Sequence, residues 1–279
     1  PTGRRRYRRP MPEGHISHRN AGLFNAAFAG RVIRRVEVPS PRIAAQRLDR
    51  RLPGETVVRA EAVGKHHLLH MESGRVLHSH LQMSGIWRVG AAGVPLRRGG
   101  LFLVIHAGDH VATLHRCPMV RLFEPGEPLP PALRTMGPDL LDPGVDPAGA
   151  TTAALAAAEA HREIGEVLLD QRVVAGIGNV FKNEACFFAG VDPWRPVGTL
   201  TAAEAGELGT IAAALLAGGV RDRGAIRTYR PPGAPPWSRQ RTWVHRRAGL
   251  PCRRCGTPVR SRGQGDANRT TYWCPSCQS

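Results

Sequence analysis

The residues whose types and spacing most directly suggest chemistry are four cysteines near the C-terminal end. Their spacing is C-x2-C-x18-C-x2-C, and the residues are Cys252, Cys255, Cys274 and Cys277. Two knuckles of this kind supply four thiolates to one tetrahedral Zn²⁺, as in a zinc ribbon. Because four cysteines fill the coordination shell, the expected ion is structural and not catalytic. Two disulfides, or two chance C-x-x-C pairs, are the alternative interpretation.

The segment between the two knuckles is expected to form a β-hairpin. It includes the stretch VRSRGQGDANRTTYWC. We expect Arg260, Arg262 and Arg269 at the hairpin tip, where they would be well placed to contact phosphates. By itself, a zinc ribbon indicates only that a protein often binds nucleic acid.

The overall charge points to a polyanionic partner. The 279 residues carry a net charge of +17, with a pI near 11.2, and only Lys65 and Lys182 are lysines among 39 basic residues. Codon bias explains arginine in place of lysine, but not the excess of basic over acidic residues. Nucleic acid is therefore the expected partner. We expect no membrane partner, because we find no apolar run near 18 residues and no basic amphipathic helix with apolar anchors.

The pattern along the chain predicts a multidomain α+β protein. Residues 12–40 suit a helix that Gly30 ends, followed by a strand. Short, glycine-separated strands from about 55 to 123 predict an antiparallel β-sandwich or barrel. A Pro/Gly-rich connector then precedes helical segments at 152–171 and 201–218, with AGIGN as a turn between two further helices. Residues 221–242 are expected to be loop. The predicted domains are 12–127, 128–245 and 246–279, after a basic leader at 1–11.

Three motifs in this order resemble the formamidopyrimidine-DNA glycosylase/endonuclease VIII family. They are MPEGH, LLDQRVVAGIGNVFKNEACF and CRRCG…NRTTYWCPSCQ, and together they extend over residues 11–279. VGKHHLLHM and SHLQMSGIWRV are also similar to strands of the family. Gln82 and Met83 resemble the endonuclease VIII branch, and HRCPMVRLF stands where the other branch has an arginine-bearing loop.

The resemblance implies a bifunctional DNA glycosylase and abasic-site lyase of base excision repair. DNA would lie in a basic cleft between an N-terminal β-sandwich and a helix–two-turn–helix domain with its zinc finger. The implied reaction is excision of an oxidised base, more often a pyrimidine, followed by β,δ-elimination. Damaged duplex or abasic-site DNA is the expected partner. We expect a monomer in the bacterial cytoplasm, associated with the nucleoid.

The resemblance also implies roles for individual residues. Pro12 would be the nucleophile, since removal of the initiator methionine leaves a secondary amine with a pKa of about 7.7–8.0. Glu13 would be the general acid/base, and Lys65 would contact the phosphate beside the lesion and assist catalysis. Position 16 is Ile, where many relatives have a second acid, so Glu13 has less help.

Further roles are implied for DNA binding. Asn179 would hydrogen-bond a phosphate, and Arg269 would clamp the phosphate of the lesion and serve δ-elimination. Gln82 and Met83 would fill the gap that an extruded base leaves. We expect Lys182 on the exposed face of its helix, without a role. Five histidines are interpreted as strand-face residues and not as a second metal site: His66, His67, His70, His78 and His80.

The position of Pro12 decides the chemistry. Inside a chain its nitrogen is an amide with no lone pair to offer. We therefore expect translation to start at Met11, which is then removed. Pro1 could be a terminal amine, but it lacks an adjacent acid. The alternatives are a genuine basic tail that silences Pro12, which would leave a lesion- or abasic-site-binding protein without lyase activity, and a zinc-ribbon RNA-binding protein.

Overall fold

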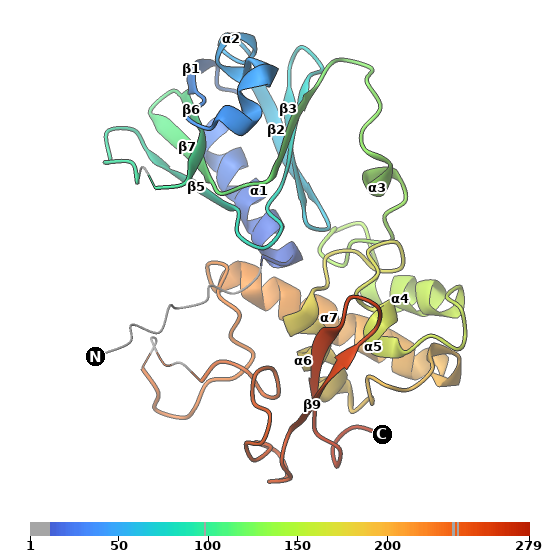
Figure 1. Ribbon diagram of the computed structural model, residues 1–279. Coiled ribbons are helices and arrows are strands. Elements are labelled where there is room, and N and C mark those ends of the chain that lie inside the picture. Colours follow the sequence, from blue (N-terminus) through green and yellow to red (C-terminus); the bar gives the residue numbers. More distant parts are fainter. Residues whose placement is uncertain (1–11, 98, 236–237, 239) are drawn as a thin grey trace.

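The computed structural model describes residues 12–97, 99–235, 238 and 240–279. The predicted leader at 1–11 lies outside the described residues. Two bodies are stacked, an N-terminal domain of β-strands and a C-terminal domain of helices, with a long connection along one side (Figure 1). The first helix runs from the strands to the junction between the bodies, so the start of the described chain lies beside the helical domain.

Helix α1 (Gly14–Phe28) follows the predicted apolar pattern. Phe24, Ala27 and Phe28 are buried on one face, and Gly30 ends the helix with a φ of 72°. A left-handed glycine is the usual conformation after a helix end. The buried face packs against the strands, which fixes the direction in which the N-terminal end of α1 points.

The strands form two antiparallel four-stranded sheets, as the sequence predicted. Their orders are β1-β6-β7-β5 and β2-β3-β4-β8. Buried residues from both sheets belong to one apolar core, among them Ile33, Leu69, Leu103 and Leu114. The elements are β1 (Ile33–Glu37), η1 (Pro41–Gln46), α2 (Leu48–Arg51), β2 (Val57–Val63), β3 (His66–Met71), β4 (Val76–His80), β5 (Ile86–Ala91), β6 (Leu101–Ala107), β7 (His110–His115) and β8 (Met119–Phe123).

The helical domain follows the Pro/Gly-rich connector and has its own apolar core. The helix expected over 152–171 is interrupted, because Ala160 O accepts a hydrogen bond from Gly198 N and Ile164 N donates to Arg195 O, both at 2.9 Å. The elements are α3 (Pro131–Arg134), α4 (Pro147–Ala156), α5 (Ile164–Val167), α6 (Asn179–Ala189), η2 (Val197–Thr199) and α7 (Ala202–Arg221).

Helix α7 is the longest element of this domain. A capping box starts it, in which Thr201 N donates to Glu204 Oε2 at 2.7 Å and Glu204 N donates to Thr201 Oγ1 at 3.2 Å. By length and composition α7 could cross a membrane, which the sequence prediction overlooked. Its apolar side packs against α4 and α6, with Leu208, Ala212 and Leu216 buried. Packing in the domain core accounts for its apolar character.

The C-terminal hairpin pairs β9 (Arg260–Gln264) with β10 (Arg269–Trp273). Arg269 lies opposite Gln264 next to the turn, as expected, but Arg260 lies opposite Trp273 at the other end. The expectation that Arg260 lies at the tip is therefore wrong. The turn is at 265–268, where Gly265 and Asn268 supply the positive φ values of 63° and 46° that a tight hairpin requires.

Candidate active site

Glu13 lies just before the first residue of α1, but its carboxylate does not cap that helix. It accepts hydrogen bonds from Val180 N at 2.8 Å and from Phe181 N at 3.3 Å, in the first turn of α6. A carboxylate suits this position, because the first N–H groups of a helix have no partner within the helix. Only 1% of Glu13 is exposed, and Pro12 beside it is half-buried. The N-terminal motif is thus joined to the GIGN motif.

Two glycines make this close approach possible. Gly14 N donates to Gly176 O at 2.9 Å, and a Cβ atom on Gly14 would lie 2.6 Å from Gly176 Cα. A Cβ atom on Gly178 would lie 2.4 Å from Glu13 Cδ. Both distances are too short for a larger residue. Gly14 is therefore required because its backbone packs directly on that of Gly176, and Gly178 because the Glu13 side chain packs against it.

Lys65 completes the group from a third segment, the turn between β2 and β3. Its Nζ donates to Ile177 O at 2.6 Å. Burial lowers the pKa of Lys65 to about 8; the charge of Glu13 opposes this shift and that of Arg269 adds to it. Burial raises the pKa of Glu13, while Lys65 and the α6 backbone N–H groups act in the opposite direction. The site therefore holds an acid whose pKa is raised beside a lysine whose pKa is lowered, and such perturbed groups cluster at functional sites.

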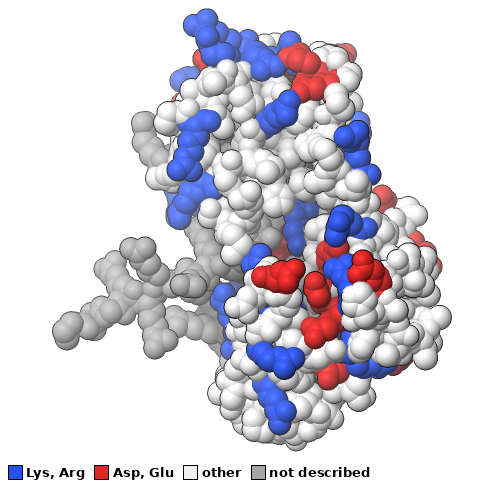
Figure 2. All heavy atoms as spheres, turned by 45° about the vertical axis from the view of Figure 1, so that its right-hand side comes forward, with Lys and Arg blue, Asp and Glu red and all other residues white. Residues whose placement is uncertain are grey.

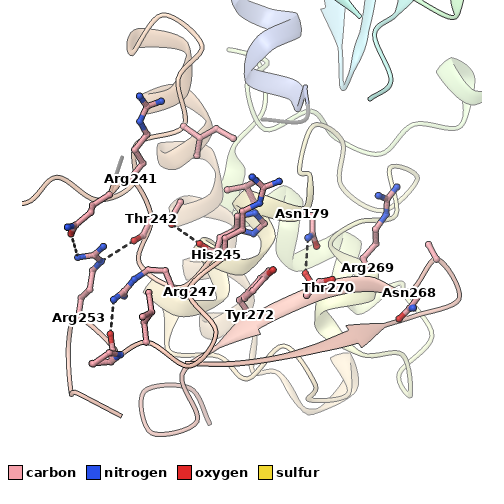
Figure 3. Close-up of a pocket in the computed structure, with 17 residues that line it drawn as sticks. Asn179, Arg241, Thr242, His245, Arg247, Arg253, Asn268, Arg269, Thr270 and Tyr272 are labelled. Carbon is pink, nitrogen blue, oxygen red and sulfur yellow. Dashed lines mark hydrogen bonds between the residues drawn. The ribbon is translucent and has the colours of Figure 1, made fainter. Parts of the chain in front are cut away.

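Asn179 and Arg269 adjoin this group from the other side. Asn179 begins α6, and its Nδ2 donates to Thr270 O at 2.9 Å, which ties the helix start to the hairpin. Arg269 precedes Thr270, and its side chain stands beside Asn179 (Figure 3). The structure thus brings Pro12, Glu13, Lys65, Asn179 and Arg269 to one place.

The other predicted DNA-binding residues lie elsewhere. Gln82 and Met83 belong to the connection between β4 and β5, where Met83 is 62% exposed and Gln82 has a φ of 47°. Gln82 N donates to His80 Nδ1 at 3.1 Å. Arg262 stacks its guanidinium over the Trp194 ring at 3.8 Å. Neither Arg262 nor Arg260 lies at the hairpin tip.

Lys182 contradicts its prediction, because it is fully buried and not on an exposed face. Its Nζ donates to Thr271 Oγ1 and, at 3.2 Å, to Gln264 Oε1. The reason is that the zinc hairpin covers this side of α6. Asn179, Lys182 and Asn183 are spaced i, i+3 and i+4 and share one helical face, so nothing within the helix itself indicates this burial.

The histidines lie on strand faces, as expected. His66 Nδ1 and His78 Nε2 are 2.8 Å apart, and Asn20 Nδ2 lies 3.2 Å from His67 Nε2. Burial lowers the pKa of His66 and of His67 to about 3, so both rings are neutral at pH 7. Within the described residues, the one group with metal-binding geometry is the four cysteines.

The cysteine geometry fits a zinc ion. The four Sγ atoms lie within 4.8 Å of one another, with Cys252 and Cys277 at 3.9 Å and Cys255 and Cys274 at 3.5 Å. A tetrahedron with Zn–S bonds of about 2.3 Å has edges of about 3.8 Å. The four thiolates hold one structural zinc, which fixes the base of the hairpin that carries Arg269.

Fold and site together define a two-domain, zinc-stabilised nucleic-acid enzyme with a buried acid and lysine at the domain junction. Three family models match the chain. They are the formamidopyrimidine-DNA glycosylase N-terminal domain at residues 11–115, its H2TH domain at 136–230 and the zinc finger found in FPG and IleRS at 249–279. The chain belongs to the formamidopyrimidine-DNA glycosylase/endonuclease VIII family, on its endonuclease VIII-like side.

Two curated relatives illustrate this similarity. "Probable endonuclease 8 2" of Streptomyces coelicolor is 42% identical, over 96% of this chain and 94% of the relative. "DNA-(apurinic or apyrimidinic site) lyase Nei2" of Mycolicibacterium smegmatis is 36% identical, over 96% and 99%.

Solved structures agree with the fold. The MutM (Fpg) protein of Thermus thermophilus is 28% identical, with a TM-score of 0.74 over 96% of this chain and 98% of that one. Lactococcus lactis Fpg, solved with DNA containing an abasic site, has a TM-score of 0.77 over 96% and 99% at 21% identity. The second similarity concerns the fold alone.

Proposed function

We propose that the group at the domain junction is the active site, with the amine of Pro12 as nucleophile. Family membership makes the chain a DNA glycosylase and abasic-site lyase of base excision repair, acting on DNA. The observation that carries the assignment of residues is the position of Glu13. Its carboxylate is fixed by two N–H groups of α6, adjacent to Pro12 and near Lys65.

The reaction follows from the chemistry of a secondary amine. The nitrogen of Pro12 attacks the sugar C1′, the bond from C1′ to the base breaks, and the base leaves with a proton. The amine then loses its N–H proton, and the C1′–O4′ bond of the sugar ring breaks as O4′ takes up a proton. This gives an iminium ion at C1′, which has no further nitrogen proton to lose. It therefore withdraws electrons while a base removes a C2′ proton and the C3′–O bond breaks. A second elimination breaks the C5′–O bond.

The neighbouring groups suit these proton transfers. Burial favours the protonated form of Glu13, which can donate a proton to the sugar ring oxygen as the ring opens. Among the described residues, Lys65 donates one hydrogen bond, to Ile177 O, whereas an ammonium group has three donors. The remaining donors can bind the phosphate beside the lesion. Arg269 stands beside Asn179 at the start of α6, where its guanidinium group can bind a phosphate (Figure 3).

This proposal requires that nothing precedes Pro12. The test is borohydride trapping on abasic-site DNA with three proteins: a chain that begins at Pro12, a chain that keeps residues 1–11, and a Pro12-initiated chain with P12G. We expect a strong adduct only with the first, mapped by peptide mass to Pro12. An adduct on Lys65, or none from the Pro12-initiated chain, contradicts the assignment. Tight binding without trapping by that chain would favour the lesion-binding alternative.

We propose an oxidised pyrimidine as the preferred base, with the Gln82–Met83 connection filling the space the base leaves. The exposure of Met83 supports this role, since an inserted side chain must project from the surface. Duplexes carrying an oxidised pyrimidine, an oxidised purine or an abasic site distinguish the steps. We expect M83A to slow base excision but not cleavage of a preformed abasic site. Equal slowing of both would oppose the insertion role.

We also propose a monomer in the bacterial cytoplasm that associates with the nucleoid. Support comes from its bacterial relatives and from the net charge of +17, which attracts it to DNA. Sedimentation of the purified chain and imaging of a C-terminal fusion in cells test the two parts. A dimer in solution, or uniform fluorescence that does not follow the nucleoid, would contradict them.

A further inference from the structure

Next to the proposed active site lies a cavity of about 1050 Å³ whose lining is unusually basic. It is bounded by the loop that precedes the zinc site and by the hairpin (Figure 3). Among the described residues that line it are His245 and five arginines, and none is Asp or Glu: Arg241, Arg246, Arg247, Arg253 and Arg269. Such a lining selects an anionic ligand.

Several arginines elsewhere in the helical domain form ion pairs with acidic side chains. Arg162 and Arg172 pair with Asp170 at 3.3 and 2.8 Å, and Arg195 pairs with Glu204 at 2.9 Å. Figure 2 shows a face of this domain on which acidic and basic side chains are interspersed. Charge neutralisation is therefore the rule on that surface, and the cavity departs from it.

Arg241 Nε donates to Ser238 O at 3.1 Å, and two further cavity arginines also have structural partners. Arg247 donates to Trp243 O at 2.7 Å and to Pro251 O at 2.8 Å. Arg253 donates to Thr242 O at 3.1 Å and stacks on the Tyr229 ring at 3.7 Å. Their donors are partly used to hold the loop in shape. Their positive charge remains, because carbonyl groups and rings do not neutralise it.

Arg246 and Arg269 differ from these three. Within the described residues, neither side chain has a hydrogen bond or an ion pair to protein. Arg246 has a φ of 58°, in the left-handed region that a residue with a Cβ atom occupies at a cost of about 1–2 kcal/mol. Such backbone strain persists only where surrounding structure imposes it, and it is often found at functional sites.

The surrounding structure that imposes it is Glu184 of α6. Its buried carboxylate accepts from Trp243 N at 2.8 Å, Val244 N at 3.0 Å and His245 N at 2.9 Å. These three residues directly precede Arg246. The same helix begins with Asn179, which holds the hairpin beside Arg269. One rigid helix therefore sets the positions of both unpaired guanidinium groups.

We propose that Arg246 and Arg269 bind two neighbouring phosphates of one DNA strand, with Arg246 as a second phosphate-binding residue. This inference rests on the proposed function, which supplies DNA as the ligand. A guanidinium can donate two parallel hydrogen bonds to a phosphate, which fixes orientation as well as charge. Arg246 thus positions the strand that Arg269 and Lys65 hold at the lesion.

The first test is the salt dependence of binding to abasic-site duplex. We use R246N, since asparagine tolerates a left-handed backbone. The matched control is R47N, because Arg47 is also exposed and left-handed, with a φ of 50°, but lies in the N-terminal domain between η1 and α2. We expect R246N to reduce the slope of log K against log[salt] by about 0.9, the value for one phosphate. R47N should leave it unchanged. Equal slopes for R246N and wild type overturn the proposal.

The second test changes the DNA as well as the protein. Single methylphosphonates, which remove one phosphate charge, are placed in turn along the damaged strand and binding by the wild-type chain is measured. One methylphosphonate position should weaken binding by wild type but not by R269A, which marks the phosphate that Arg269 contacts. At the phosphate next to it, we expect a methylphosphonate to weaken binding by wild type but not by R246N. If no position couples to R246N, the proposal fails. Trapping at Pro12 by the wild-type chain shows separately whether the proposed function stands.

Discussion

The only two lysines of the chain lie in two regions that share burial but differ in how their donors are used. Burial lowers the pKa of both Lys65 and Lys182 to about 8. Lys182 lies between α6 and the hairpin and donates to two side chains, Gln264 and Thr271. Lys65 lies at the domain junction and donates to one backbone carbonyl, that of Ile177.

The region around Lys182 is a closed network. Gln264, which accepts from Lys182, donates in turn to Glu163 Oε2 at 3.0 Å and to Pro193 O at 2.8 Å. The region around Lys65 is not a closed network. The Lys65 ammonium group has donors left over after its bond to Ile177 O, and the neighbouring acid Glu13 has a raised pKa. A similar lowering of the pKa therefore does not indicate similar roles. Satisfied donors indicate an architectural lysine, and unused donors indicate one that can meet a substrate.

Removal of zinc should give the largest difference in behaviour between the two regions. Loss of the ion from the four cysteines should unfold the hairpin, expose Lys182 and abolish binding to abasic-site DNA, since binding a structural zinc is worth about 10–16 kcal/mol. Lysine acylation followed by mass spectrometry reports on both lysines in one sample. We expect Lys182 to be protected with zinc and modified after chelation, while the β-sandwich stays folded. Protection of Lys182 in the chelated protein would contradict this account.

Replacing Lys65 should affect activity more than folding. We expect K65M to slow strand cleavage by about 10²–10⁴-fold, the range for a group that takes part in proton transfer. Removing its charge also raises the pKa of Glu13 further, because Lys65 lowers that pKa in the wild type. Single-turnover cleavage and thermal unfolding measure the two effects. A large drop in Tm with little change in cleavage would reverse the two roles.

Replacing Lys182 should do the opposite. K182M removes charged hydrogen bonds to Gln264 and Thr271, which contribute about 1.5–3 kcal/mol to the free energy of unfolding. Denaturant unfolding should show this loss, and cleavage at saturating DNA should change little. In the double variant K182M/T271V the loss should be smaller than the sum of the two single losses, because both polar partners are gone. Additive losses would mean that the two side chains do not interact.

The smallest effect is expected from pH. Each lysine has a folded pKa of about 8 and an ordinary value of 10.5, so between these values the unfolded chain binds more protons than the folded one. The free energy of unfolding should therefore rise as pH increases from about 8 to 10.5. Cleavage should fall around pH 8, because Lys65 there loses the charge that binds phosphate. In K65M and in K182M the free energy of unfolding should rise less with pH than in wild type. Only in K65M should the decrease in cleavage with pH that Lys65 causes disappear.

Local sequence patterns predicted the parts of the molecule that local geometry determines. The four cysteines identify their own site because knuckle spacing alone brings the thiolates together. The helix before Gly30 and the strands to residue 123 follow from apolar periodicity and turn glycines. The role of Glu13 came from resemblance, and nothing in the neighbouring residues indicates that its carboxylate reaches α6.

Errors arose mainly where the position or burial of a residue depends on a segment far away in the sequence. Lys182 looked exposed because the hairpin that covers it lies more than eighty positions further along the chain. Arg260 was misplaced because the whole segment was treated as a tip, although Gly265 and Asn268 mark the turn itself. Arg246 was not singled out at all, since its left-handed backbone depends on Glu184 and leaves no trace in the residues beside it.

The pairing of Glu13 with α6, and of Asn179 with the hairpin, has a consequence for synthesis of the protein. These contacts connect residues 167 and 91 positions apart, so the site joins the first and last parts of the described chain. Domains fold as they emerge from the ribosome, and the N-terminal sandwich can form early. The proposed nucleophile, Pro12, nevertheless has the full set of neighbours only after residue 270 has been made. We therefore expect a chain that lacks the hairpin not to cleave DNA, which would confine a strand-breaking activity to completed molecules.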